Sequence, residues 1–481
     1  MGEYTTVIGL EVHVQLNTTS KAFCADLNQF GDDPNVNISA VSLALPGTLP
    51  VLNLAQVKSA IKLAHALKSE IDPKNRFDRK NYFYPDLPKG YQITQDNAPI
   101  CNGGYLEYIS DGKTKRVAIH HVHMEEDAGK NIHDLYAHYS VVDINRAGTP
   151  LLEIVTEPDL RSAQEVHDFI AALQQLVRYL DISDGNMEEG SLRCDVNVSV
   201  MPVGSTEYGE RNEIKNVNSK KFARTAVEYE SKRQIKILES GGTIEKNTLL
   251  FDPEKGTTKP MRSKEEVNDY RYFPDPDLPP LNLSKEFIED AISEIDLLPW
   301  TAKKSLIEDF GRSEYEAEIL SREKDIALNF MSYGVEKEQW NTLSNFFINQ
   351  LLPYRQQSEK DIASFNRQNI TAFVKLLDSG KVSKSVALKT LSEIVLSSIE
   401  NLNIEELAKR ENLIQSQDQD FLDQLISDVM SQNIDKVKAY QKGKKGLIGF
   451  FMGQVMGRAK GKANPQVLTE KLSKALTNFE V

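Results

Sequence analysis

Residues 7–16, VIGLEVHVQL, alternate apolar and polar side chains from Leu10 to the end of the segment. Successive side chains of a β-strand point to opposite faces, so one face of this segment would be entirely apolar. That face would carry Ile8, Leu10, Val12, Val14 and Leu16. The pattern therefore predicts a strand with one side in a hydrophobic core.

The opposite face of this strand would carry Glu11, His13 and Gln15. Residues two apart on a strand are separated by roughly 7 Å, so Glu11 and His13 are close enough to bind one cation. A solvated polar face is the alternative, because an antiparallel strand can have one side in water.

Composition limits the class of protein. A chain of 481 residues is too long for one typical core and predicts roughly two to four domains. Cys24, Cys101 and Cys194 lie far apart with no CxxC pair, which argues against a zinc ribbon and against a disulfide scaffold. No apolar stretch approaches the roughly 20 residues that cross a bilayer, and no signal peptide is evident. We therefore expect a cytoplasmic protein without a membrane partner.

Charge is unevenly distributed along the chain. The formal net charge of −13 argues against nucleic acid binding over the whole surface, because phosphate binding needs clustered Lys and Arg. Residues 436–462 are the exception, with eight basic residues and no acidic one. The tail is therefore a local positive region on an acidic chain.

The residue composition and the hydrophobic pattern change twice along the chain. Together they predict an α+β protein. Residues 1–292 are rich in alternating runs, Gly and Pro, which favours a strand-rich domain. Within it, residues 162–180 have a helical period, with Ser162 as N-cap and Glu165 placed for a capping box. The segment FPDPDLPPL, with four prolines, marks the approach to a boundary. Helical domains are then expected at residues 293–403 and 404–481.

Three further segments predict strands with polar faces. Residues 116–130, RVAIHHVHMEEDAGK, would carry Val117, Ile119, His121, His123 and Glu125 on one side, followed at the turn by Glu126 and Asp127. In GTPLLEIVTEPD, Glu153 lies among apolar residues, where a buried carboxylate needs a cation or a donor. In EEGSLRCDVNVSV, the polar face would carry Arg193, Asp195, Asn197 and Ser199. Each segment alone is consistent with a solvated face, but their recurrence favours a sheet lining a polar cleft.

The types of polar side chain on these strands indicate which metal ion and which class of reaction to expect. Carboxylates with one or two imidazoles and no thiolate pair favour Mg²⁺ or Mn²⁺ over structural zinc. Carboxylate-held Mg²⁺ most often serves phosphate chemistry, so a nucleotide is expected, although the chain has no GxxxxGK[ST] loop. Arg79, Lys80 and Lys89 are candidates to contact its phosphates, and the tyrosines among them are equally consistent with packing.

Seven motifs in order along the chain resemble the B subunits of the bacterial tRNA-dependent amidotransferases, and the ending GKANPQVLTEKL is similar to that family's tail. The resemblance covers essentially the whole chain. The motifs are IGLEVHVQL, FDRKNYFYPDLPKGYQITQ, HMEEDAGK, VDINRAGTPLLEIVTEPD, MEEGSLRCDVNVS, EIKNVNS and DYRYFPDPDLPPL.

The resemblance implies a ligase that works in two steps on misacylated tRNA. The side-chain carboxylate of Glu on tRNA(Gln), or of Asp on tRNA(Asn), is phosphorylated with ATP and Mg²⁺ and is then amidated by ammonia. The ammonia comes from a glutaminase subunit, and a small third subunit makes the complex a heterotrimer. The implied fold is a cradle related to glutamine synthetase, followed by a helical domain and a YqeY-like tail that binds tRNA.

Site residues carry over from the family to matching positions. Metal ligation is implied for Glu11, His13, Glu126 and Glu153, and the sequence leaves Glu125 open as the alternative to Glu126. Catalytic roles are implied for His13, Glu126 and Glu153. Cofactor contacts are implied for Lys80, Arg193, Asp195 and Asn197, with Glu189 beside them; a structural ion pair is the alternative for Arg193. The tRNA-binding residues would be Lys442, Lys444, Lys445, Arg458, Lys460 and Lys462.

The chain departs from the family at two points. His121 occupies a position where the family commonly has Arg, and the cysteines of a zinc site found in some members are missing, so we expect no zinc. One rival hypothesis is a tRNA-binding or assembly subunit of the same complex without chemistry of its own. Another is a free-standing metal hydrolase that uses His123 and Glu126.

Overall fold

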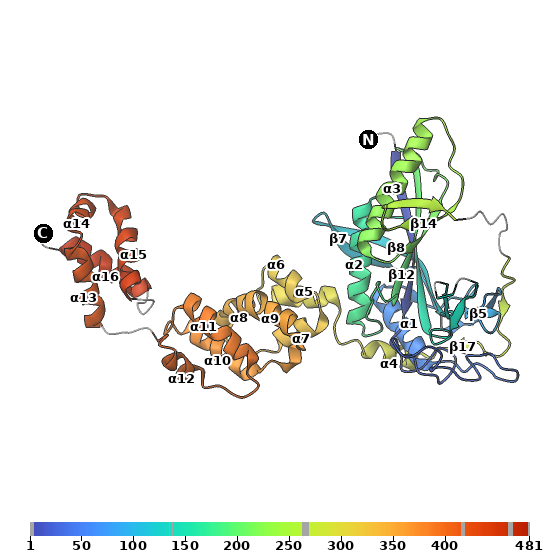
Figure 1. Ribbon diagram of the computed structural model, residues 1–481, viewed down its shortest axis with the longest axis horizontal. Coiled ribbons are helices and arrows are strands. Elements are labelled where there is room, and N and C mark those ends of the chain that lie inside the picture. Colours follow the sequence, from blue (N-terminus) through green and yellow to red (C-terminus); the bar gives the residue numbers. More distant parts are fainter. Residues whose placement is uncertain are drawn as a thin grey trace. The chain divides into compact units, whose positions relative to one another are not determined.

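The computed structural model describes residues 4–133, 135–136, 138–261, 269–414, 419–459 and 465–479. The chain divides into two compact units, Met1–Pro299 and Trp300–Val481. The first is built on a large sheet and the second is helical, so the predicted α+β class is confirmed (Figure 1). The domain limits expected from the sequence, 292/293 and 403/404, remain predictions.

The large sheet of the first unit contains ten strands, counted over the described residues. They are β1 (Tyr4–Gln15), β2 (Glu70–Ile71), β6 (Cys101–Asn102), β7 (Tyr105–Ser110), β8 (Lys113–Glu126), β11 (Pro150–Thr156), β12 (Leu192–Pro202), β13 (Asn212–Val217), β14 (Thr248–Asp252) and β15 (Thr257–Pro260). Their order is β15-β14-β13-β12-β1-β11-β8-β6-β2, and β7 pairs with β8. Strand β1, which contains the alternating residues Leu10 to Gln15, is therefore central and runs antiparallel to both β11 and β12.

One face of this sheet is the hydrophobic core. All five apolar residues predicted for β1 are buried in it, and so are the alternate residues Leu192 to Val200 of β12. Helices α2 (Ala163–Tyr179) and α3 (Lys220–Glu239) pack side by side over this face (Figure 1). The N-cap at Ser162 is confirmed, but the Glu165 carboxylate accepts from the backbone N–H of Arg161 and not from that of Ser162.

The phase of β8 changes in its middle, which corrects a prediction. Val117 and Ile119 face the core, whereas beyond them Val122 and Met124 do so. The pairing with β11 slips here, because Thr156 lies opposite Ile119 and Val155 lies opposite His121. One extra residue in a strand reverses the faces of all that follow. His121, His123 and Glu125 thus share the polar face, but Val117 and Ile119 do not.

Small sheets lie near the end of β8. Strand β4 (Asp78–Asn81) pairs with both β5 (Tyr91–Thr94) and β16 (Phe273–Pro274). The remaining elements of the unit are β3 (Lys74–Asn75), β9 (Lys130–Ile132), β10 (Val141–Asp143), β17 (Leu281–Asn282), α1 (Leu54–Ala66) and α4 (Lys285–Ser293). The Gln92 side chain of β5 donates to the backbone carbonyl of Glu126, so β5 is attached to the end of β8.

The second unit contains two hydrophobic clusters, each formed by its own helices. The first comes from α5 (Pro299–Glu308), α6 (Glu314–Leu320), α7 (Lys324–Met331), η1 (Lys337–Gln339), α8 (Trp340–Phe346), η2 (Phe347–Leu351), α9 (Leu352–Ser358), η3 (Ile362–Ser364), α10 (Arg367–Asp378), α11 (Lys384–Ser397) and α12 (Ile404–Arg410). The second comes from α13 (Gln419–Ser431), α14 (Ile434–Gln441), η4 (Lys445–Leu447), α15 (Ile448–Ala459) and α16 (Pro465–Asn478). Among the described residues, none of the helices has the length and apolar character needed to span a membrane.

Candidate active site

A row of polar residues crosses four neighbouring strands on the face of the sheet opposite the core. His13 of β1 lies opposite Arg193 of β12 on one side and Glu153 of β11 on the other. Glu153 in turn lies opposite His123 of β8. Residues directly opposite each other in antiparallel strands have Cβ atoms about 5 Å apart, so this register brings the side chains into contact.

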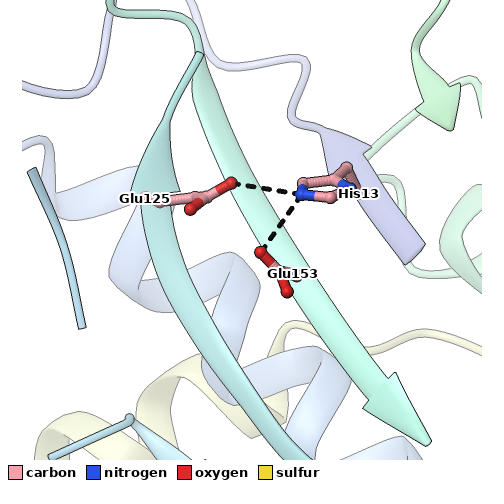
Figure 2. Close-up of side chains that lie close together, drawn as sticks. All are labelled: His13, Glu125 and Glu153. Atoms are coloured by element: carbon pink, nitrogen blue, oxygen red, sulfur yellow. Dashed lines mark ion pairs between the residues drawn. The ribbon is translucent and has the colours of Figure 1, made fainter. Parts of the chain in front are cut away.

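His13, Glu125 and Glu153 form a compact cluster within this row. The His13 Nε2 atom lies 3.1 Å from Glu153 Oε2 and 3.5 Å from Glu125 Oε1. Figure 2 shows the three side chains converging from three strands. His123 Nε2 approaches the same carboxylates, at 3.4 Å from Glu153 and 3.5 Å from Glu125. One ligand atom from each of the first three residues lies within 4.8 Å of the other two, a spacing suited to one metal ion.

The electrostatics of the cluster follow from buried opposite charges. Burial alone would lower the pKa of His123, but the negative charge of Glu153 and hydrogen bonds to Glu125 and Glu153 outweigh it and raise the pKa to about 10. His13 shows the same balance and a raised pKa. The pKa of Glu153 is held well below its usual range, because the two imidazoles outweigh its burial. Glu153 and the two imidazoles thus each favour the charged form of the other.

Glu11 lies two residues before His13 on β1 and lines a cavity. Its carboxylate accepts a hydrogen bond from Asn197 Nδ2 at 3.0 Å, and its pKa is raised by burial and by the charge of Glu153. The cavity has a volume of about 230 Å³ and is lined by Gly9, Glu11, Asn197 and Arg211, among others. Within the described residues, no donor reaches the buried Oδ1 atom of Asn197. The cavity lining therefore combines the Glu11 carboxylate with the Arg211 guanidinium.

Arg193 and Asp195, two of the expected cofactor contacts, are both engaged in ion pairs. Asp195 Oδ2 accepts from Lys215 Nζ at 2.8 Å. Arg193 donates to Asp127, not to Asp195, at 2.8 Å. Asp127 is buried and also accepts from Gln15 Nε2 at 2.8 Å, with Arg146 close by at 3.6 Å. This carboxylate thus joins β1, β12 and the end of β8, a role that sequence reasoning missed.

Glu126, expected to be a metal ligand and catalytic, is not brought to the cluster. Its Oε1 atom accepts from the ammonium of Lys89 and from the backbone N–H of Ile93. Its neighbour Glu125 turns to the sheet face instead and accepts from Thr94 Oγ1 at 3.3 Å. The structure thus places Glu125 with His13 and Glu153, and pairs Glu126 with a lysine that had been a phosphate candidate.

The other expected site residues are not among the side chains that meet at the cluster. The ammonium of Lys80 lies 4.9 Å from the centre of the Tyr270 ring, and Glu189 is exposed. Arg79 is held by Asp275 and Asp277. Of the residues predicted to bind tRNA, Lys442, Lys444, Lys445 and Arg458 are exposed, and Lys460 and Lys462 lie outside the described residues.

The ligand set implied by the family resemblance did not include His123, which entered only the rival hydrolase hypothesis, although the strand phase places it beside Glu125. His121 stacks on His123, with ring centres 5.2 Å apart. Burial and the positive charges of His123 and His120 lower the pKa of His121 to about 4. The position where the family commonly has Arg is therefore uncharged at neutral pH.

Comparisons with known proteins agree with the sequence motifs. Residues 6–289 match the family model described as the GatB/GatE catalytic domain, and residues 329–476 match the one described as the GatB domain. The chain is 44% identical over 476 residues to the B subunit of the aspartyl/glutamyl-tRNA(Asn/Gln) amidotransferase of Thermodesulfovibrio yellowstonii, covering 98% of this chain and 99% of that protein. It is 45% identical over 479 residues to the protein of the same name from Geotalea daltonii, with the same coverage. The resemblance predicted from the motifs is confirmed: this chain belongs to the family of amidotransferase B subunits.

Proposed function

We propose that this chain activates the side-chain carboxylate of Glu-tRNA(Gln), Asp-tRNA(Asn) or both with ATP, and that the same site then forms the amide. The observation that carries the proposal is the cluster of buried Glu125 with half-buried His13 and Glu153 on the polar face of the sheet. The names of the relatives support the substrate class. As in that family, the partners would be a glutaminase subunit with a small third subunit, in the cytoplasm.

The donor atoms present fit a divalent cation. Two carboxylates and an imidazole converge, and carboxylate oxygens are the ligands that Mg²⁺ and Mn²⁺ prefer. His13, Glu125 and Glu153 would hold the ion, with His123 and Glu11 close by. When bound, such an ion neutralises charge on transferring phosphate oxygens.

The proposed reaction has two steps, and in each of them one bond forms as another breaks. A carboxylate oxygen of the substrate bonds to the γ-phosphorus of ATP as the bond to ADP breaks. Ammonia then bonds to the carbonyl carbon, phosphate leaves and a proton is lost. A carboxylate is a poor electrophile, so this phosphate provides its leaving group.

The residues of the chain would position both substrates and exclude water. The cavity beside Glu11 would receive part of the nucleotide, because it adjoins the strand that carries His13 and its lining includes Arg211, whose guanidinium can meet phosphate oxygens. Glu125 is almost fully buried, so an acyl phosphate near it would be shielded from hydrolysis.

The test uses the complete complex with ATP, Glu-tRNA and hydroxylamine in place of ammonia. Hydroxylamine would trap the acyl phosphate as a hydroxamate on the tRNA, detected by mass spectrometry. We expect the side-chain hydroxamate, as distinct from the α-hydroxamate that hydroxylamine forms by cleaving the ester to tRNA, only when ATP is present; it should be lost on chelation and return with Mg²⁺ or Mn²⁺. Side-chain hydroxamate that forms equally well after chelation would contradict the metal site, and its complete absence would favour the non-catalytic assembly subunit.

We further propose that the basic tail binds the tRNA backbone. Replacing the exposed Lys442, Lys444 and Lys445 by Ala should lower the slope of log Kd for tRNA against log salt by about three, or about one for each phosphate that the variant no longer binds. The matched control replaces three exposed lysines of other regions, Lys113, Lys285 and Lys304. An equal change of slope in both variants would mean that the tail makes no special contribution.

A further inference from the structure

Three tyrosines form a continuous aromatic array outside the hydrophobic core. The ring centres of Tyr82 and Tyr270 lie 5.9 Å apart, and those of Tyr270 and Tyr272 lie 6.0 Å apart, each pair meeting at 71°. We call Tyr82, Tyr270 and Tyr272 the tyrosine wall. Lys80 adds a positive charge, since its ammonium lies 4.9 Å from the centre of the Tyr270 ring.

The tyrosine wall is held close to the Glu125 end of β8. The Asn81 backbone N–H and side chain both donate to the carbonyl of Tyr270, which fixes residues 270–272 beside β4. Strand β4 pairs with β5, and β5 contacts β8 through Thr94 and Glu125. Burial, and then the charges of Asp96, Tyr270, Glu125 and Glu153, raise the pKa of Tyr272. The pairing of β4 with β5 and the hydrogen bond from Thr94 to Glu125 therefore place the tyrosine wall beside the strand that contacts the cluster.

Part of this aromatic surface is open to solvent, which core packing does not explain. Tyr272 is 37% exposed, and Phe83, which follows Tyr82 in the chain, is 87% exposed. Exposed aromatic rings beside a lysine are the arrangement by which proteins hold single-stranded nucleic acid, because bases stack on the rings and the ammonium meets the backbone. Such stacking tolerates any base.

We propose that the tyrosine wall and Lys80 bind the unpaired 3′ end of the aminoacyl-tRNA and so place the aminoacyl group over the His13–Glu125–Glu153 cluster. This inference rests on the proposed function and assigns residues to its second substrate. An aminoacyl group is esterified to the terminal nucleotide of an unpaired end, so that end must come within reach of the cluster. The cavity beside Glu11 is lined by β1, β11 and β12 residues, whereas the tyrosine wall is attached through β5 to β8. The two substrates would thus approach the cluster from different sides.

The experiment measures binding of uncharged tRNA to the complete complex, using intact tRNA and the same tRNA without its unpaired 3′ end. We expect the wild-type complex to bind the intact form about 10-fold more tightly, or about 1.4 kcal/mol, as stacking of one or two bases gives. Tyr272→Ala should abolish this difference, and Tyr272→Phe should keep it, because stacking needs the ring and not the hydroxyl group. Tyr139→Ala, which removes a tyrosine that is 77% exposed elsewhere in the unit, is the control and should keep it. Tyr270→Ala is the second variant.

Kinetics of the same variants separate the alternatives. For Tyr272→Ala we expect a higher KM for Glu-tRNA and an unchanged KM for ATP. A higher KM for ATP alone would assign the tyrosine wall to adenine, and loss of a partner protein on purification would assign it to docking within the complex; either result overturns the proposal. An unchanged preference for intact tRNA in both Ala variants would also overturn it. Because binding of uncharged tRNA needs no chemistry, failure of the hydroxamate test would leave this result interpretable.

Discussion

Replacing Glu153 by Gln is expected to reduce acyl phosphate formation by about 10³-fold or more, equivalent to about 4 kcal/mol of transition-state stabilisation. Gln keeps the size of the side chain but removes the negative charge that lies 3.1 Å from His13 and 3.4 Å from His123. Two imidazoles would then face each other with one carboxylate fewer between them. The site would lose a metal ligand and its strongest compensating charge. The measurement is single-turnover hydroxamate formation, together with the Kd for Mn²⁺.

The matched control is Glu107→Gln, an exposed glutamate of β7 on the same sheet. It should change neither the rate nor Mn²⁺ binding. For Glu153→Gln we expect Mn²⁺ affinity to fall at least about 10-fold, while tRNA binding stays unchanged. A Glu153→Gln rate close to wild type would refute the assignment of this carboxylate to the active site.

Replacing Asp127 by Asn is expected to destabilise the first unit by about 2 to 3 kcal/mol. The buried Asp127 carboxylate accepts from Gln15 and Arg193, and neutralising it would leave Arg193 partly buried without its counter-charge. The two tryptophans, Trp300 and Trp340, both belong to the second unit and do not report on this unfolding. Hydrogen exchange of peptides from β1, β8 and β12 is therefore the appropriate measurement.

The loss of stability caused by Asp127→Asn is expected to depend on pH. Burial alone would raise the pKa of Asp127, but the charges of Arg193 and Arg146 and the hydrogen bond from Gln15 hold it below its usual range. A depressed folded-state pKa stabilises the protein fully above the unfolded value of about 3.9 and loses that contribution as pH falls through the folded value. The difference between wild type and Asp127→Asn should therefore be constant near pH 7 and shrink below about pH 4. Asp111→Asn, at an exposed turn, should show no such difference.

Much of the candidate site could be predicted, because the alternation of side chains along a strand can be recognised from the sequence of that strand alone. The alternation in residues 7–16 assigned Glu11 and His13 to one face, and the alternation in β12 did the same for Arg193, Asp195 and Asn197. Both strands are long and regular, so their phase is constant. In β8 the phase reverses at the irregular pairing near His120, and nothing in the local composition marks that position.

The choice between Glu125 and Glu126 as metal ligand could not be made from strand periodicity. Both lie at the last two positions of β8, where the chain leaves the strand. Their directions depend on Thr94 and Ile93 of β5 and on Lys89, all of which lie more than 30 residues earlier in the chain. Local sequence carries no information about which distant partner each carboxylate meets.

The sequence by itself determined the family, the core-facing residues of β1 and β12, and the kinds of ligand available, because each is a property of residue identity and short-range spacing. Tertiary structure alone decided which ligands meet. His13, Glu125 and Glu153 converge because β1, β8 and β11 pair in one register, which aligns residues more than 100 positions apart. Register depends on burying the whole apolar face at once and is therefore a property of the assembled sheet.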